Sequence, residues 1–349
     1  MQPNEKGSRA TFPDNRSHEI VSARQPWMAS IIRKKGAIVN KKTLDLAGIY
    51  PPIPTPFDSD GKIATLALTE NLRRWNQYQL RGYAVLGSNG ELVLLSEQER
   101  LRVLEIARDA IPLDKLMIAG TGCQSTEQTV TLTKKAGAIG ADAALVVSPS
   151  YYRGLMTKDA LRAHFHAVAD ASSIPIIIYN IPSCTGIDLD AETIAALAEH
   201  ENIIGIKDSG GNVIKMAEIG RLTGPDFQVL AGSASFLLPA LSVGAVGGIL
   251  ALANIAPAQC LAIRQSFLDQ EWEQARQLQM RMIPPNTAVT RRWGVPAVKA
   301  ALDMLGMYGG PARPPLPLLS NETKQELRVI LSQAGILHDG TPQDDNEDR

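Results

Sequence analysis

One lysine at the end of an apolar run is the residue of this chain whose setting most suggests covalent chemistry. The run Ile203-Ile204-Gly205-Ile206 leads directly into Lys207, and a glycine-rich turn follows. Such a run, bounded by turn signals, is typical of a strand buried on both faces. Because burial disfavours the charged form of an amine, a lysine there can act as a nucleophile that forms a Schiff base with a ketone. The alternative is a strand-end lysine whose charge reaches water.

Small polar and phenolic side chains follow other apolar runs. Ser88 and Asn89 lie between two glycines, where converging backbone N–H groups could hold a carboxylate. Tyr151 and Tyr152 follow another run, and Tyr179 closes a third, from which its phenol could relay protons as general acid and base. Ordinary turn and packing roles are the alternatives for these residues. The set indicates carbonyl chemistry through an imine rather than metal-dependent hydrolysis or hydride transfer.

A regular alternation of strands and helices, beginning at Gly48, must position these residues. Each apolar run precedes a helical pattern with its own start signal, such as the capping box at Ser96 and Glu99. The expected strands are 48–54, 82–87, 115–120, 143–147, 174–179, 203–207, 227–231 and 246–250. Eight such units match a (β/α)8 TIM barrel. A doubly wound sheet is the alternative, but prolines replace the glycine-rich phosphate turn expected after its first strand.

The rest of the chain is expected to form appendages to this barrel. The predicted organisation is an extension over 1–45, the barrel over 46–267, a C-terminal helical extension over 268–335 and a disordered acidic tail over 336–349. In the helical extension, the periodicity predicts helices over 271–283, 294–304 and 322–331. Pro284-Pro285 and Gly309-Gly310-Pro311 are expected to separate them.

The extension over 1–45 has two interpretations. The stretch 28–42 holds five basic residues and no acid, as in a mitochondrial transit peptide. Acidic residues upstream, at Glu5, Asp14 and Glu19, do not fit that pattern and favour a disordered arm. Three widely spaced cysteines indicate a reducing compartment, so we expect an intracellular protein, cytoplasmic or mitochondrial.

Composition and motif content argue against nucleic acid, a membrane or a metal ion as the partner. A net charge of -1 gives no reason to expect binding to nucleic acid, and no apolar run is long enough to cross a membrane. The chain lacks CxxC and HExxH spacings, and His164 and His166 are expected to be surface or packing residues. We therefore expect neither a metal site nor a membrane segment, and a small molecule as the partner.

Five motifs stand in the order of the strands: Thr55-Pro56-Phe57, Gly87-Ser88-Asn89-Gly90-Glu91, Tyr151-Tyr152, Tyr179-Asn180-Ile181-Pro182 and Gly205-Ile206-Lys207-Asp208. Together they resemble the dihydrodipicolinate synthase / N-acetylneuraminate lyase family from about Gly48 to the last helix. The resemblance implies a class I pyruvate aldolase or related lyase on a (β/α)8 barrel. By this resemblance Lys207 forms the Schiff base with a 2-oxo acid and Tyr179 transfers protons. Ser88 and Asn89 would hold the carboxylate of the 2-oxo acid and relay protons.

The resemblance also implies an oligomer and needs no cofactor, since the lysine itself supplies the electrophilic catalysis. Tyr152 occupies the position of a tyrosine that reaches into a neighbouring subunit's site. A homotetramer built from two dimers is therefore the expected assembly.

Within that family, the chain departs from the dihydrodipicolinate synthases. Those enzymes carry an arginine five residues after the catalytic tyrosine, where it binds the carboxylate of the aldehyde substrate. Here that position is Cys184, which cannot form the bidentate pair of an arginine. They also usually carry two threonines where this chain has Ser88 and Asn89.

The chain is instead similar to the 4-hydroxy-2-oxoglutarate aldolases of animals. The further motifs on which this rests are Asp208-Ser209-Gly210-Gly211, Val229-Leu230-Ala231-Gly232-Ser233-Ala234, Ala251-Leu252-Ala253-Asn254, Ala288-Val289-Thr290-Arg291-Arg292 and Tyr308-Gly309-Gly310-Pro311. Several of these lie outside the catalytic set, so they indicate the subgroup rather than the family at large.

The leading hypothesis is a class I aldolase that cleaves 4-hydroxy-2-oxoglutarate, or a close analogue, to pyruvate and glyoxylate. The expected catalytic residues are Lys207, Tyr179, Ser88 and Tyr152. The expected substrate-binding residues are Ser88, Asn89, Cys184, Ser209, Gly232, Ser233 and Ile249. Alternatives are an aldolase or dehydratase for a longer 2-oxo-3-deoxy sugar acid, and a lyase like dihydrodipicolinate synthase. A non-catalytic 2-oxo acid-binding barrel is disfavoured because it should have lost the lysine or the tyrosine.

Overall fold

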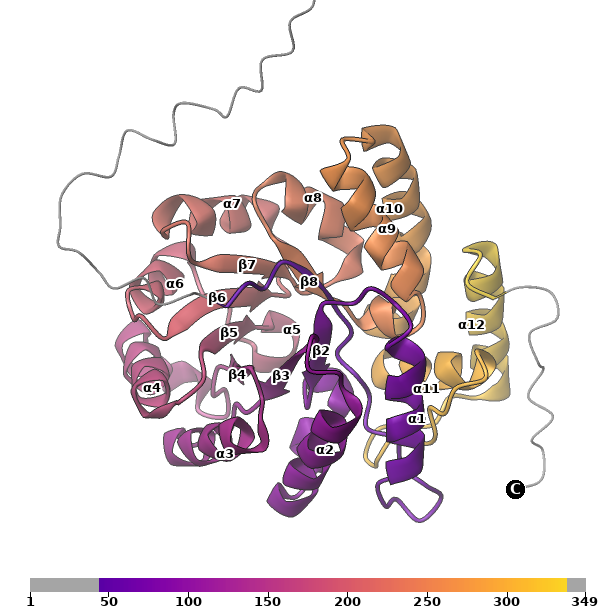
Figure 1. The fold of residues 1–349 in the computed structure, drawn as a ribbon, viewed down its shortest axis with the longest axis horizontal. Coiled ribbons are helices and arrows are strands. Elements are labelled where there is room, and N and C mark those ends of the chain that lie inside the picture. Colours follow the sequence, from indigo (N-terminus) through magenta and orange to yellow (C-terminus); the bar gives the residue numbers. More distant parts are fainter. Residues whose placement is uncertain (1–43, 338–349) are drawn as a thin grey trace, which may run out of the picture. The chain divides into compact units, whose positions relative to one another are not determined.

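Eight parallel strands form the centre of the molecule in a computed structural model that describes residues 44–337 (Figure 1). They are β1 (Gly48–Tyr50), β2 (Gly82–Val85), β3 (Leu116–Gly120), β4 (Ala143–Val147), β5 (Ile176–Asn180), β6 (Ile203–Asp208), β7 (Gln228–Ala231) and β8 (Gly247–Ile249). The strand order is β1-β8-β7-β6-β5-β4-β3-β2. At the remaining seam, Ile53 N donates to Ala84 O at 3.0 Å and Ala84 N donates to Pro51 O at 3.0 Å. These bonds join β1 to β2, so the predicted (β/α)8 barrel is confirmed.

A helix on the outer side follows each strand (Figure 1). These helices are α1 (Thr65–Trp75), α2 (Glu97–Ala110), α3 (Thr126–Ile139), α4 (Lys158–Ala171), α6 (Ala191–Ala198), α7 (Val213–Leu222), α8 (Leu237–Ser242) and α9 (Pro257–Leu268). Local sequence explains where several begin. Ser96 and Glu99 form the predicted capping box of α2, and Ser125 caps α3. The helices therefore start where their own side chains satisfy the first free N–H groups.

Two short elements at the strand ends lie outside the sequence predictions. A 3-10 turn, η2 (Ser88–Gly90), follows β2, and a one-turn helix, α5 (Pro182–Thr185), follows β5. Pro182 stands at the first turn of α5, where a missing N–H leaves no helical bond unmade. Both elements carry expected site residues, Ser88 and Asn89 on η2 and Cys184 on α5.

The expectation that Pro284 and Pro285 end a helix is wrong. Helix α10 (Trp272–Thr287) contains both prolines, and the π-helix η7 (Ala288–Arg292) follows it directly. Each proline removes only its own N–H donor, and the carbonyls of both still accept from Ala288 N. Tertiary contacts also hold this segment, since Gln279 Nε2 donates to Ala234 O at 2.8 Å. Packing therefore outweighs the local helix-breaking signal.

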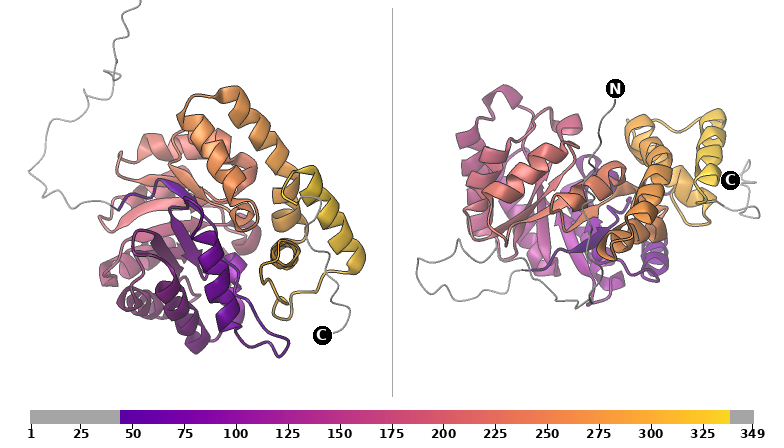
Figure 2. Two further views of the ribbon diagram at one scale, coloured as in Figure 1. Left: turned by 45° about the vertical axis from the view of Figure 1, so that its right-hand side comes forward. Right: turned by 90° about the horizontal axis from the view of Figure 1, so that it is seen from above.

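Two more helices complete the C-terminal part. They are α11 (Gly294–Met304) and α12 (Asn321–Gln333). Helix α12 lies outside α10 and α11, on one side of the barrel (Figure 2). It buries Leu327 and Leu331 fully, so its apolar stripe faces the rest of the molecule.

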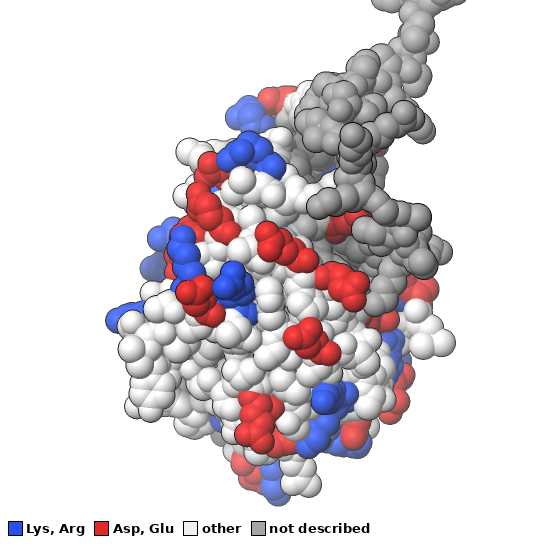
Figure 3. Space-filling model, turned by 90° about the vertical axis from the view of Figure 1, so that its left-hand side faces the viewer, with Lys and Arg blue, Asp and Glu red and all other residues white. Residues whose placement is uncertain are grey.

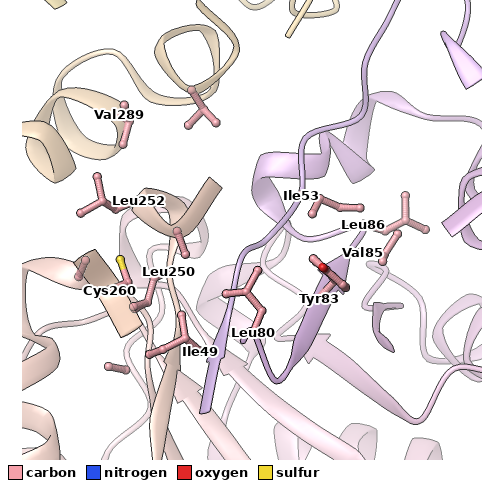
Figure 4. Close-up of a cluster of buried hydrophobic side chains, with 14 of the residues drawn as sticks. Ile49, Ile53, Leu80, Tyr83, Val85, Leu86, Leu250, Leu252, Cys260 and Val289 are labelled. Carbon is pink, nitrogen blue, oxygen red and sulfur yellow. The ribbon is translucent and has the colours of Figure 1, made fainter. Parts of the chain in front are cut away.

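The core has two parts, because side chains alternate between the two faces of each strand. Inside the barrel, a cluster contains Tyr50, Ala84, Ile118, Leu145, Ile177, Tyr179, Ile204, Leu230 and Ile249. The larger cluster lies between the strands and helices. Figure 4 shows this outer packing where β1 and β2 meet, with Ile53 and Leu86 on one side and Leu250 and Cys260 on the other. Both faces of the strands are therefore packed, which holds the strand ends in place.

The described residues add two facts about possible partners. None of their helices is long and apolar enough to cross a membrane. Acidic and basic side chains are interspersed on the described part of the face shown in Figure 3. The transit-peptide interpretation and most of the predicted acidic tail fall on residues 1–43 and 338–349, which lie outside the described part of the chain.

Candidate active site

Lys207 and Tyr179 face each other inside the barrel. They are register partners on the neighbouring strands β6 and β5. The Lys207 Nζ lies 4.0 Å from the centroid of the Tyr179 ring. Only 3% of Lys207 and 5% of Tyr179 are exposed. The sequence alone left open a strand-end lysine that reaches water, and this burial rules that alternative out.

The Tyr179 side chain connects the lysine to the turn after β2, because its ring meets Lys207 and its hydroxyl meets Ser88. Its oxygen lies 3.2 Å from Ser88 Oγ, and either group can donate. The described structure therefore places three of the four expected catalytic residues, Lys207, Tyr179 and Ser88, in one chain of contacts. A phenol with a hydroxyl neighbour on one side and an amine against its ring can pass a proton between substrate and protein.

The turn that carries Ser88 and Asn89 has a strained backbone. Leu86 and Glu91, which bracket it, have φ angles of 62° and 56°, a region that non-glycine residues rarely adopt. Thr55 Oγ1, from the segment after β1, donates to Gly90 O at 2.7 Å and holds the turn. Such strain persists only where surrounding structure maintains it, and it is common at functional sites.

Asn89 has a free donor. Its Nδ2 is buried and makes no hydrogen bond within the described residues. Burying an amide N–H without an acceptor is costly unless a ligand supplies one. This donor therefore fits the expected role of Asn89 in holding a carboxylate.

A cavity of about 560 Å³ opens beside Tyr179 and Ser88. Its lining includes Cys184 from α5, Ser148 and Ser150 after β4, and Val147 from β4. Cys184 is exposed to this space. The position at which the family resemblance implies an arginine in dihydrodipicolinate synthases thus presents a thiol to the cavity.

The expected substrate-binding residues at the ends of β6, β7 and β8 do not line this cavity, and neither do Lys207 and Asn89. Ser209 and Gly232 are neighbours, since a Cβ added to Gly232 would lie 2.1 Å from Ser209 Oγ. Ser233 Oγ accepts a hydrogen bond from Asn286 Nδ2 of α10 at 2.9 Å. Ile249 is fully buried in the barrel interior together with Tyr179. Ile249 therefore shares the interior cluster with Tyr179 at the C-terminal end of β8.

Tyr152 stands apart from the other expected catalytic residues. Its side chain is 68% exposed, and its ring packs edge-on against Tyr151 with 5.0 Å between centroids. It does not line the cavity of its own chain. Two exposed aromatic rings side by side are typical of a surface that packs against another molecule.

Sequence reasoning missed several residues around this site. Arg100 of α2 is the one lysine or arginine among the described residues that line the cavity, and Gln124 and Gln128 line it too. Arg100 Nε donates to Leu92 O at 3.2 Å. The capping box and apolar periodicity that predict this helix do not indicate which of its polar residues faces the cavity.

A buried ion pair behind the strained turn was also missed. Glu91 Oε1 lies 2.6 Å from Lys299 Nζ, and both side chains are 1% exposed. Glu91 Oε2 accepts from Arg313 N at 2.8 Å. Burial lowers the pKa of Lys299, and the Glu91 charge opposes that shift. Since 208 residues separate Glu91 from Lys299, no local pattern could have indicated the pair.

The described residues contain no group of three or more His, Cys, Asp or Glu side chains placed to hold a metal ion. His164, one of the two histidines considered from the sequence, is a buried packing residue. Its Nδ1 lies 2.9 Å from Thr126 Oγ1, and burial lowers its pKa to about 4.

Comparisons with known proteins agree with this geometry. The sequence model of the dihydrodipicolinate synthetase family matches residues 45–334. The chain is 36% identical, over 291 residues, to the 4-hydroxy-tetrahydrodipicolinate synthase of Methanothrix thermoacetophila, with 83% of this chain and 97% of that protein covered.

Solved structures give the same result. The 4-hydroxy-tetrahydrodipicolinate synthase of Methylacidiphilum fumariolicum SolV superposes with a TM-score of 0.80 at 33% identity, covering 83% of this chain and 96% of that one. The dihydrodipicolinate synthase of Aquifex aeolicus superposes with a TM-score of 0.79 at 33% identity, covering 83% and 98%. The similarity thus extends over the barrel and the C-terminal helices.

Proposed function

The chain belongs to the dihydrodipicolinate synthetase family of lyases, and on that premise we propose that it is a class I aldolase that cleaves 4-hydroxy-2-oxoglutarate, or a close analogue, to pyruvate and glyoxylate. The contact of Lys207 Nζ with the Tyr179 ring, at 4.0 Å, carries the proposal. A buried amine against a phenol, which is itself 3.2 Å from a serine hydroxyl, suits imine chemistry.

In the proposed mechanism, Lys207 Nζ attacks the C2 ketone of the substrate, and loss of water gives a protonated imine. The imine withdraws electrons from C3. When the 4-hydroxyl loses its proton, the C3–C4 bond breaks, its electron pair forms an enamine, and glyoxylate leaves. Protonation of the enamine at C3 and addition of water to the imine release pyruvate and restore the free lysine.

Tyr179 is the proposed proton-transfer group. Its phenolate takes the proton of the 4-hydroxyl and returns a proton to C3 of the enamine. Ser88 donates to the phenolate at that stage, which lowers the cost of its charge. Asn89 Nδ2, buried without a partner among the described residues, is the proposed donor to the C1 carboxylate.

Cys184 supports the choice of substrate within the family. The resemblance implies that dihydrodipicolinate synthases hold the carboxylate of the incoming aldehyde with an arginine at this position. A thiol cannot replace that charge-assisted bidentate contact. We therefore propose aldol cleavage rather than condensation with an amino aldehyde as the activity.

Trapping the imine tests the mechanism. Treatment with pyruvate and borohydride should reduce the imine to a stable secondary amine on the peptide that contains Lys207, detectable by mass spectrometry. Lys207→Ala should abolish this adduct. An adduct on another lysine, or none in the unmodified protein, would overturn the mechanism.

A substrate panel tests the specificity. Pyruvate release should be fast with 4-hydroxy-2-oxoglutarate and slow with 2-oxo-3-deoxy sugar acids, while pyruvate and aspartate-4-semialdehyde should not condense at a comparable rate. Strong turnover of a sugar acid with none of 4-hydroxy-2-oxoglutarate would favour the second candidate. Rapid condensation would favour a synthase like the named relatives.

We further propose that the enzyme is a homotetramer, in which Tyr152 completes the site of a neighbouring subunit. The exposed Tyr151–Tyr152 pair supports this proposal. Mixing the inactive variants Lys207→Ala and Tyr152→Phe under subunit exchange should then restore activity, because some sites combine an intact lysine with an intact tyrosine. Failure to recover activity in demonstrably mixed oligomers would contradict the shared site.

A further inference from the structure

A buried polar cluster lies directly behind the Lys207–Tyr179 pair. Asn180 and Asp208 follow the two catalytic residues in sequence, and they are register partners just as Tyr179 and Lys207 are. Because successive strand residues point to opposite faces, Asn180 and Asp208 project away from the barrel interior. Asp208 is 0% exposed and Asn180 is 1% exposed.

Asp188 and Lys215 complete this group, which we call the β5–β6 cluster. Asn180 Nδ2 donates to Asp188 Oδ1 at 2.7 Å and to Asp208 Oδ2 at 3.3 Å. Lys215 Nζ, from the first turn of α7, pairs with Asp208 Oδ2 at 2.9 Å and also with Asp188. One ammonium and one amide group are therefore shared between two carboxylates.

The amide of Asn180 supplies both donors and an acceptor to the groups around it. Its two N–H groups serve the two carboxylates, while its Oδ1 accepts from Leu189 N at 3.1 Å. An aspartate there would present a third negative charge and would lose both donors. Because unmatched buried charges are costly, such a change should displace the strand ends that carry the cluster.

Backbone bonds connect the cluster to the site. Asp208 Oδ1 accepts from Gly210 N at 2.6 Å, and so shapes the turn after β6. Ser209 N donates to Asn180 O at 2.9 Å, which ties that turn to the end of β5. The cluster thus fixes the last peptides of both strands, each one residue from a catalytic side chain.

We propose that Asn180 and Asp208 are positioning residues that hold the Lys207 amine against the Tyr179 phenol during imine formation. The inference rests on the proposed Schiff-base function. Misplacement of reacting groups by about 1 Å can slow a reaction by about two orders of magnitude. The cluster therefore acts on the rate of imine formation, while binding of the 2-oxo acid depends on groups inside the barrel.

The test measures pyruvate imine formation in the full chain, by rapid mixing followed by borohydride quenching at timed intervals. Asn180→Asp and Asp208→Asn should slow adduct formation per reactive site by about 10-fold or more. The final yield should stay near one adduct per folded chain, and the half-saturating pyruvate concentration should change little. A merely structural role would lower the folded fraction and the final yield but leave the rate per reactive site unchanged.

Matched controls make the same chemical changes outside the cluster. Asn321→Asp lies on the exposed first turn of α12, and Asp159→Asn lies on the exposed first turn of α4. Both should react at the rate of the unmodified protein. If either cluster variant fails to fold, Asn180→Ser, which adds no charge, provides the test, with an expected slowing of about 3-fold to 10-fold.

The outcomes separate the two hypotheses. Folded cluster variants that react per site at the unmodified rate overturn the positioning role while leaving the proposed function intact. Absence of any adduct in the unmodified protein, or an adduct that persists in Lys207→Ala, overturns the proposed function itself.

Discussion

At the scale of single residues, the proposed mechanism depends most directly on the Tyr179 hydroxyl. Replacing Tyr179 with Phe keeps the ring against Lys207 but removes the oxygen that meets Ser88 at 3.2 Å. We expect turnover to fall by about 10²-fold to 10⁴-fold, since general acid–base groups contribute on that scale. Steady-state pyruvate release measures the effect.

Tyr83→Phe is a matched control for that substitution. Tyr83 is also buried on a strand, but its hydroxyl donates to Asn76 Oδ1 at 2.7 Å on the outer side of the barrel. Removal of the Tyr83 hydroxyl should leave turnover within a few-fold of that of the unmodified enzyme. If Tyr179→Phe behaves like Tyr83→Phe, another group must transfer the proton.

His164 should make the stability of the protein depend on pH. Burial lowers its pKa to about 4, from an ordinary value near 6.5. The unfolded chain therefore binds a proton before the folded chain does. Stability that is fully present above pH 6.5 is lost as the pH falls from 6.5 toward 4.

Urea unfolding between pH 7 and pH 4 measures this loss, with His164→Gln as the non-titrating comparison. The unmodified protein should lose on the order of 2 kcal/mol of unfolding free energy beyond the loss in the variant. Equal losses in the two proteins would show that His164 is not the responsible group.

At the scale of elements, local sequence signals predicted most strands and helices of the barrel, but not the course of α10 or the short elements η2 and α5. The apolar run and the capping box placed β4 and the start of α2 correctly because these signals are internal to each segment. The path of α10 through Pro284 and Pro285 depends on packing against other segments, which a local reading does not contain. For the same reason η2 and α5, whose geometry serves the site, were not predicted.

The Glu91–Lys299 ion pair connects the turn after β2 to α11, and we expect it to be sensitive to removal of one partner. Lys299→Met leaves the Glu91 carboxylate buried without its cation, which should cost about 3–5 kcal/mol of unfolding free energy. Turnover should also fall, because Glu91 adjoins the turn that carries Ser88.

The double variant Glu91→Gln/Lys299→Met removes the unpaired charge and should recover part of the lost stability. Denaturant unfolding of the unmodified protein, the single variants Glu91→Gln and Lys299→Met, and the double variant forms a double-mutant cycle. Additive losses would show that the two side chains do not act as a pair.

At the scale of the whole molecule, the site is assembled from parts far apart in sequence. Lys207, Tyr179 and Ser88 could be predicted because each lies at the end of its own strand, and a parallel barrel brings those ends together. The cavity wall also contains Val295 and Leu316, from the C-terminal part. Their place depends on how those segments pack against the barrel, for which the sequence holds no periodic or motif signal.

Closure of the barrel is the property on which all of these contacts depend, and it requires Gly247. β8 pairs with β1 through Gly247 and Gly48, and a Cβ at Gly247 would lie 1.9 Å from Gly48 O. The overlap between this Cβ and the Gly48 carbonyl can be relieved only if β1 and β8 move apart. Gly247→Ala should therefore lower the melting temperature sharply and abolish turnover together with it.

The matched control is Gly220→Ala in α7, where an added Cβ meets nothing within 4 Å. In a helix interior that change should be neutral or stabilise by up to about 1 kcal/mol. Thermal unfolding of both variants measures the difference, and a Gly247→Ala protein that melts like the control would show that this seam tolerates a wider separation.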